Sequence, residues 1–350
     1  MKNWELGEKE FLFALHKRMG NSGLSWRDDC IERRITPDLS LVYSIDSTQR
    51  KLSHNGGNDP RAFGKWAASI VASDVIACGV APKGLALDVG IAAFQSNDEL
   101  FSFFDGVLDV CSQYKMTYEG GNMNRSSFIC GVAWGTQTPN KIIHRDGARD
   151  GSVLIATAPI GLGWAIELFR SMDDIFRGIS IPSELLYWVE NYKDNVVINL
   201  DAFQKIWELG VIDCGMDLTD GIIEFGYEIH DRTSLGVVFS PASPHPFVKF
   251  VADHLKIDPT DIMFELGYDT PLSHGWCILK EHVPIVLDIL QKYNVSFTIL
   301  GKVTHEVSGV YRETKSGLSR LPRYWDDKFK NGTNFELWEE NILGFTPQDT

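Results

Sequence analysis

The chain has 350 residues, of which 44% are hydrophobic, and its formal net charge is −14. Because a single hydrophobic core seldom grows past about 250 residues, this length predicts two domains. The negative charge argues against a nucleic-acid backbone or an anionic membrane surface as the main partner. No segment approaches the roughly 20 apolar residues of a membrane span, and no apolar leader follows Met1, so we expect a cytoplasmic protein.

The six cysteines lie far apart in the sequence, and no two of them form a C-x-x-C pair. This spacing predicts neither a zinc site nor a disulfide framework. Buried free thiols in a reducing compartment are therefore expected at Cys30, Cys78, Cys111, Cys130, Cys214 and Cys277.

The first half of the chain predicts alternating helices and strands. An amphipathic segment at Glu8–Arg18 is followed by Asp28-Asp29-Cys30, and the alternation of Leu39–Asp46 is typical of a strand that ends on an acid. The segment 53–58 is rich in Gly, Asn, Ser and His and predicts an irregular loop. Further predicted elements are strands at 84–93, 116–119 and 127–136 and a helix at 98–114.

A long helix is predicted from Asp59 to Gly79, with Asp59 as its cap and Pro60 in its first turn. Asp74 falls on the apolar stripe of this helix, one turn after Ile70. A buried carboxylate requires a cation or hydrogen-bond donors, because an unpaired buried charge is costly. A functional role is favoured for Asp74, and the alternative is a core acid bonded to backbone amides.

The turn-rich segment 142–151 predicts a domain boundary near residue 150. Gly161-Leu162-Gly163 could seat phosphate at a helix start, but close helix packing explains these glycines equally well. We expect an N-terminal domain (1–150), a C-terminal α+β domain (151–312) and a tail (313–350). The second half predicts strands at 152–157, 235–239 and 297–303, helices at 164–170, 246–255 and 283–293, and a further element at 262–270.

The segment Ile212–Gly221 places two carboxylates and a hydroxyl at a predicted strand-to-helix junction. A short apolar run precedes Asp217, and helical spacing follows Asp220, so the two acids flank the helix start. The alternative is purely structural, with Thr219 or Asp220 capping the helix and Asp217 in a loop.

Several acids share a position at the end of an element or on a buried stripe, namely Asp29, Asp46, Asp74, Asp217 and Asp220. An oxygen-only ligand set favours Mg²⁺, which proteins commonly share with nucleotide phosphates. The predicted chemistry is phosphoryl transfer, in which metal ions and a guanidinium neutralise charge on the transferred group. Arg145 is the candidate guanidinium; the alternatives are that it is a solvated arginine, or that Arg149 has this role.

The ordered motifs resemble thiamine-monophosphate kinase, of the superfamily that includes aminoimidazole ribonucleotide synthetase, selenophosphate synthetase and a hydrogenase maturation protein. The resemblance covers roughly residues 5–330. It rests on Asp28-Asp29-Cys30, Ser44-Ile45-Asp46, Asp59-Pro60, Ser73–Gly79, Gly120-Gly121-Asn122, Arg145–Ala148, Met216–Gly221 and Gly267-Tyr268-Asp269.

The resemblance implies an α+β, two-domain synthetase-type fold, whose N-terminal sheets pair across a homodimer to form a barrel. It implies Mg²⁺ and ATP as the metal and the co-substrate. Metal ligation is implied for Asp29, Asp46, Asp74, Asp217 and Asp220, and ATP contact for Gly121, Asn122, Arg145 and Thr219. Catalytic roles are implied for Asp217, Asp220 and Arg145, and acceptor contact for His54, Tyr268, Asp269 and Trp325.

The chain departs from the family pattern at three places. The family's Gly-Gly-Asp is Gly120-Gly121-Asn122, so a metal-binding carboxylate becomes an amide. The usual Gly-Gly-Glu-Asp-Tyr is Leu266–Thr270, which changes the charge and the stacking surface of the acceptor pocket. The usual threonine before the first-strand acid is Ile45. These changes predict an acceptor other than thiamine phosphate.

The leading hypothesis is an ATP- and Mg²⁺-dependent phosphotransferase with a small-molecule acceptor. One alternative is ATP-driven activation of an amide or carbonyl oxygen, as in the synthetases. Another is a nucleotide-binding regulatory protein that has lost turnover through Asn122. The selenophosphate branch is disfavoured because Cys30 lacks a glycine-rich setting, and the hydrogenase branch because no cysteine lies within Pro347–Thr350.

Overall fold

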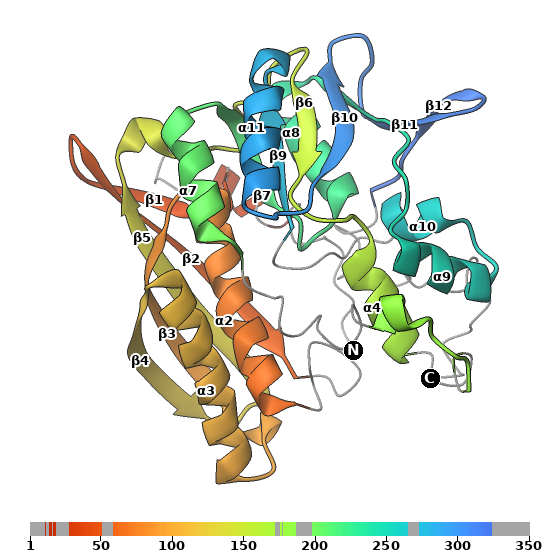
Figure 1. Ribbon diagram of the computed structural model, residues 1–350. Helices are drawn as coiled ribbons and strands as arrows, with labels where there is room; N and C mark the ends of the chain where they lie inside the picture. Colours follow the sequence, from red (N-terminus) through yellow and green to blue (C-terminus); the bar gives the residue numbers. More distant parts are fainter. Residues whose placement is uncertain are drawn as a thin grey trace.

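The computed structural model describes residues 28–50, 59–171, 178–186, 198–264 and 273–323, together with residues 11, 14, 15, 17, 18 and 176. Two β-sheets lie on either side of residue 150 in the sequence, and helices pack against both (Figure 1). The predicted α+β class with two sheets is thereby confirmed. Among the described helices, none is long and apolar enough to cross a membrane.

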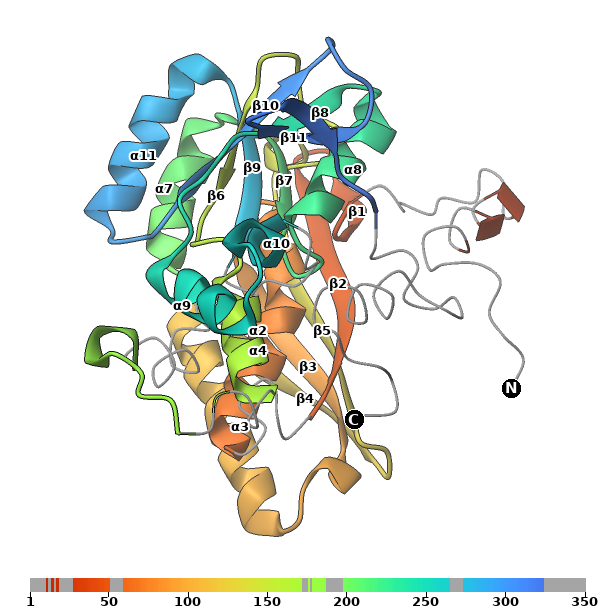
Figure 2. The same ribbon diagram turned by 90° about the vertical axis from the view of Figure 1, so that its right-hand side faces the viewer.

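The first sheet has five strands in the order β1-β2-β5-β3-β4. Helices α2 (Pro60–Ala77) and α3 (Asn97–Tyr114) pack against one of its faces, as Figures 1 and 2 show from perpendicular directions. The side chains of β2 alternate between the two faces of the sheet. Ser44 is buried on the face that the helices cover, whereas the neighbouring Ile45 is 60% exposed. The elements are β1 (Ile31–Thr36), β2 (Leu39–Gln49), α2 (Pro60–Ala77), β3 (Pro82–Gly90), η1 (Ile91–Ala93), α3 (Asn97–Tyr114), β4 (Thr117–Asn124), β5 (Phe128–Gln137) and η2 (Pro139–Lys141).

Helix α2 begins where the sequence predicts. The Asp59 carboxylate accepts hydrogen bonds from the amides of Arg61 (3.0 Å) and Ala62 (3.4 Å). Gly64 lets α3 approach closely, because a Cβ at this position would collide with the Phe103 carbonyl oxygen. The other side of α2 also packs against β7 of the second sheet, so this helix lies between the two halves of the chain.

The second sheet has seven strands in the order β12-β11-β8-β10-β6-β9-β7. The β11–β12 hairpin extends it to Arg320, beyond residue 312, where the sequence places the end of this domain. The elements are β6 (Val153–Ala156), α4 (Leu162–Ser171), α7 (Leu200–Leu209), β7 (Ile212–Asp217), α8 (Ile222–Thr233), β8 (Gly236–Phe239), α9 (Pro246–Leu255), α10 (Pro259–Phe264), β9 (His274–Ile278), η4 (Lys280–His282), α11 (Val283–Lys292), β10 (Thr298–Thr304), β11 (Val310–Thr314) and β12 (Gly317–Arg320).

The two halves share a hydrophobic core. Trp276 of β9 is fully buried and belongs to one cluster with Phe63 of α2 and Phe203 of α7. The ring of His274, also fully buried, donates from Nε2 to the carbonyl of Ser73 at 3.2 Å. These contacts fix the C-terminal half of α2, which carries Asp74, against the second sheet.

Helix α9 is capped by His245, whose Nδ1 accepts a hydrogen bond from the Phe247 amide at 3.2 Å. Only a neutral imidazole can accept this bond. Burial lowers the pKa of His245 below its ordinary 6.5, so the unfolded chain takes up a proton more readily as the pH falls below that value. The stability that the His245 cap contributes should therefore be fully present above pH 6.5 and decrease below it.

We expect His245→Asn, which keeps a capping oxygen that does not titrate, to reduce this loss by about 1 kcal/mol. The measurement is the free energy of unfolding in urea at about pH 7.5 and about pH 5.5. His254→Asn on the same helix is the control and should retain the wild-type pH dependence. An equal loss in His245→Asn and wild type would contradict the prediction.

Candidate active site

Three carboxylates from distant parts of the sequence converge beside the end of β7. Asp29 precedes β1, Asp74 belongs to α2, and Asp217 ends β7. Each can offer one oxygen, and these oxygens lie within 4.8 Å of one another. We call these residues the acid triad. Like charges at this spacing repel, and an oxygen-only donor set is the chemistry that hard divalent cations prefer.

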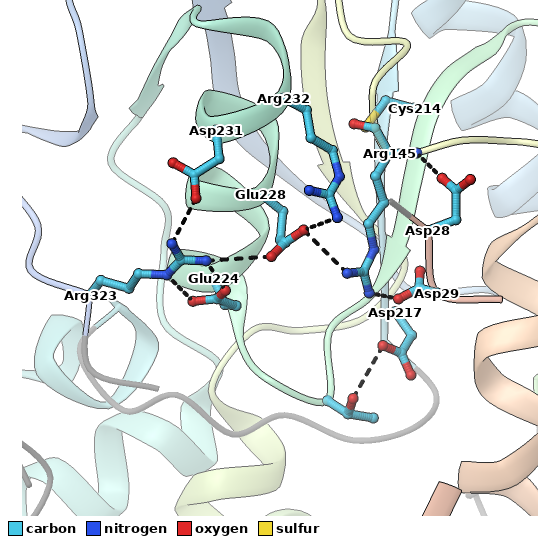
Figure 3. Close-up of polar contacts among 11 residues, drawn as sticks. Asp28, Asp29, Arg145, Cys214, Asp217, Glu224, Glu228, Asp231, Arg232 and Arg323 are labelled. Atoms are coloured by element: carbon cyan, nitrogen blue, oxygen red, sulfur yellow. Dashed lines mark hydrogen bonds and ion pairs between the residues drawn. The ribbon is translucent and has the colours of Figure 1, made fainter. Parts of the chain in front are cut away.

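The surroundings of the acid triad fit a cation. Burial, followed by the charges of Asp217 and Asp46, raises the pKa of Asp74 well above its usual value, against the opposing hydrogen bond from Ser44 Oγ. Both oxygens of Asp29 are buried, and Oδ2 accepts no hydrogen bond among the described residues. One of them pairs with the guanidinium of Arg145 (Figure 3). The triad thus stabilises positive charge, whether from a metal ion or from an arginine.

No side chain in the junction between β7 and α8 caps the start of α8. Helix α8 has Gly221 at its N-cap, with no capping side-chain hydrogen bond. The capping alternative for Thr219 or Asp220 is therefore wrong: the Thr219 hydroxyl instead donates to Asp217 Oδ1 at 3.1 Å. The strand register also positions Asp217, because its backbone lies opposite that of His274 where β7 pairs with β9.

The Asp28 side chain, next to Asp29 in the sequence, holds the backbone of Arg145 beside the triad. The Asp28 carboxylate accepts from the Arg145 amide at 2.9 Å and contacts His144 Nδ1 at 2.7 Å. Burial opposes ionisation of Asp28, yet the bonds from His144 and Arg145 outweigh it and lower its pKa. The bond with Asp28 raises the pKa of His144. This arrangement joins residues 28–29 to residues 144–145.

The structure distinguishes the two candidate arginines. The Arg145 side chain is only 15% exposed, so it is not a solvated arginine. The Arg149 side chain is 57% exposed and pairs instead with Asp213. Arg145 is therefore the guanidinium that lies at the acid triad.

Sequence reasoning missed a buried charge network on α8, which Figure 3 shows. Glu228 contacts the guanidiniums of Arg145, Arg232 and Arg323. Arg323 also pairs with Glu224 and with Asp231. The signal in the sequence was the spacing of Glu224, Glu228 and Arg232, which recur every four residues and so share one side of the helix.

Some predicted site residues lie apart from the triad within one chain. Asp46 lies on β2, and its charge raises the pKa of Asp74. Gly121 and Asn122 lie on β4, which β5 and β3 separate from β2. The Asn122 amide donates to Asp88 Oδ1 at 3.1 Å. His54, Tyr268, Asp269 and Trp325 lie outside the described residues.

Comparison with known proteins finds a family domain in the first half of the chain and solved structures with the same fold. Residues 27–136 match the family described as AIR synthase related protein, N-terminal domain. A selenide, water dikinase of Caldanaerobacter subterraneus is 28% identical over 63% of this chain, and the chain spans 60% of that relative's length. A thiamine-monophosphate kinase of Aquifex aeolicus is 30% identical over 51% of this chain and 56% of its own.

A solved thiamine monophosphate kinase of Aquifex aeolicus has the same fold, with a TM-score of 0.68 and 19% identity. The superposition covers 89% of this chain and 98% of that structure. Residues 27–136 therefore resemble the AIR synthase N-terminal domain, and the chain as a whole shares the fold of a solved thiamine monophosphate kinase.

Proposed function

We propose that this protein is an ATP- and Mg²⁺-dependent phosphotransferase that transfers the γ-phosphoryl group of ATP to a small metabolite. The observation that carries the proposal is the acid triad with the Arg145 guanidinium beside it. Relatives named as kinases of thiamine monophosphate and of selenide support the same class of reaction. The acceptor pocket diverges from the thiamine-monophosphate kinase pattern at Tyr268 and Thr270, so we expect a different acceptor.

Different residues of the site would bind the metal ion and the nucleotide phosphates. Asp29, Asp74 and Asp217 would hold Mg²⁺, with Asp46 and Asp220 completing the acidic surface. When bound, the metal would neutralise charge on the phosphates of ATP. Arg145 would contact these phosphates, since a planar guanidinium matches phosphate oxygens in a bidentate manner. Thr219 donates its one hydroxyl proton to Asp217 and so orients that carboxylate; to contact the nucleotide it would redirect this proton to a phosphate oxygen.

We also propose a homodimer that forms through the face of the first sheet that no described helix covers. Apolar side chains on this sheet are exposed within one chain, including Ile35 at 58%, Ile45 at 60% and Phe128 at 53%. Such a surface is unusual for a monomer, and pairing two sheets would cover it. The partner's β4 could then bring Gly121 and Asn122 toward a nucleotide. Sedimentation at several protein concentrations tests this assembly.

Calorimetric titration with Mg²⁺ and ATP tests the proposed function, because an ATP- and Mg²⁺-dependent phosphotransferase must bind both. The absence of binding to ATP and to ADP would exclude the function. Release of ADP with a panel of acceptors, including thiamine phosphate and selenide, then identifies the reaction. Binding without ADP release from any acceptor would favour the regulatory alternative.

A further inference from the structure

Glu228 is surrounded by three arginines from separate parts of the chain. Its side chain is only 4% exposed, and its carboxylate lies 2.6 Å from Arg232 Nη2, 3.3 Å from Arg145 Nη1 and 3.4 Å from Arg323 Nη2. One oxygen, Oε2, contacts both Arg145 and Arg232 (Figure 3). Within the described part of the chain, Glu228 therefore joins Arg145 to the helix α8 network.

Arg145 and Arg232 require this shared partner because their like charges are close. Burial, and then the nearby charge of Arg145, act to lower the pKa of Arg232, while the charge of Glu228 opposes them. Without a carboxylate between them, two partly buried guanidiniums would repel and separate. The other amino group of Arg145 pairs with Asp29, so two carboxylates hold this guanidinium on opposite sides.

We propose that Glu228 is a positioning residue that fixes the guanidinium of Arg145 beside the acid triad, in the orientation that receives nucleotide phosphate. This inference rests on the proposed function, since it assumes that Arg145 contacts ATP. It adds a residue outside the acid triad, which acts through Arg145. A planar guanidinium with defined neighbours loses little conformational entropy when it binds an anion, and this is the advantage that Glu228 provides.

The test is the affinity of Glu228→Gln for Mg²⁺ and ATP, measured by calorimetry. We expect binding about tenfold weaker than wild type, the usual effect of losing a hydrogen bond to a charged group. Asp231→Asn is the matched control, because Asp231 lies on the same helix and contacts Arg323 but is 47% exposed. It should bind the nucleotide like wild type.

A double-mutant cycle separates positioning from a general structural role. If Glu228 acts through Arg145, adding Glu228→Gln to Arg145→Ala should cause no further loss of affinity. Additive losses would overturn the proposal, as would unchanged affinity in Glu228→Gln. Wild-type protein that fails to bind Mg²⁺ and ATP would instead refute the proposed function, so the two failures are distinguishable.

A second variant covers the case in which Glu228→Gln does not fold. Glu228→Gln combined with Arg232→Gln removes one charge of each sign and so avoids an unbalanced buried arginine. This pair should still bind about tenfold more weakly, because Arg145 has lost the carboxylate of Glu228 and keeps only that of Asp29. Arg232→Gln alone should retain wild-type affinity, because Glu228 still contacts Arg145. Wild-type affinity in the double variant would overturn the proposal.

Discussion

Asp217→Asn is expected to weaken the binding of Mg²⁺ and ATP by about 100-fold or more, because it removes the negative charge of a proposed metal ligand. Asp217 is 3% exposed and is positioned by both the Thr219 hydroxyl and the register of β7 with β9. Asparagine has nearly the same shape and can still accept the Thr219 hydrogen bond, so the change removes charge and little else. Calorimetric titration of wild type and variant measures the effect. Asp74→Asn should give a similar loss.

The same substitution should not destabilise the protein when no metal is added. Removing one of three repelling carboxylates should leave the free energy of unfolding unchanged or raise it by about 1 kcal/mol. Asp213→Asn, on the same strand, is the control: it breaks the pair with Arg149 and should leave nucleotide affinity intact. Unchanged affinity in both Asp217→Asn and Asp74→Asn would exclude the acid triad as the metal site.

Local signals in the sequence predicted most of the regular elements. Helix α2 combined an acid cap, a first-turn proline and an apolar stripe, and it begins at Pro60 as expected. Strand β9 was missed, because all its residues are buried and its sequence does not alternate between polar and apolar. Strand β1 was missed because its polar side chains are typical of a solvated loop.

Glycines misled the prediction at β4. The sequence Gly120-Gly121-Asn122 predicts the end of a strand, but β4 continues through it to Asn124. A Cβ at Gly121 would collide with the carbonyl of Leu87 on β3, so glycine here permits close pairing of two strands rather than a turn. Composition alone cannot distinguish these two uses of glycine, because the distinction depends on a neighbouring strand.

The candidate site was predictable in its parts but not in its assembly. The helical period placed Asp74 on a buried stripe, and family resemblance implied Asp29 and Asp217 as its companions. The contact between Arg323 and Glu228 joins residues 95 positions apart, and no periodic pattern reports such a pair. The charge network therefore required the three-dimensional fold, although the four-residue spacing on α8 indicated which side of the helix it occupies.

Arg323→Ala is expected to lower the free energy of unfolding by about 3 kcal/mol, because it removes the guanidinium that pairs with the buried carboxylate of Glu224. Arg323 Nε lies 2.9 Å from Glu224 Oε2, and the Glu224 side chain is only 1% exposed. The guanidinium also lies over the ring of Tyr227 at 5.3 Å, a contact that alanine cannot replace.

Urea unfolding at neutral pH measures this loss of stability. Arg320→Ala on the exposed side of β12 is the matched control, and its free energy of unfolding should change by no more than about 0.5 kcal/mol. Combining Arg323→Ala with Glu224→Gln should restore part of the stability, since the buried charge that lost its ion pair with Arg323 is then gone. A loss no larger than that of Arg320→Ala would contradict this account. Because Glu228 contacts both Arg323 and Arg145, a large loss would mean that the segment after β12 stabilises the same network that orients the arginine at the acid triad.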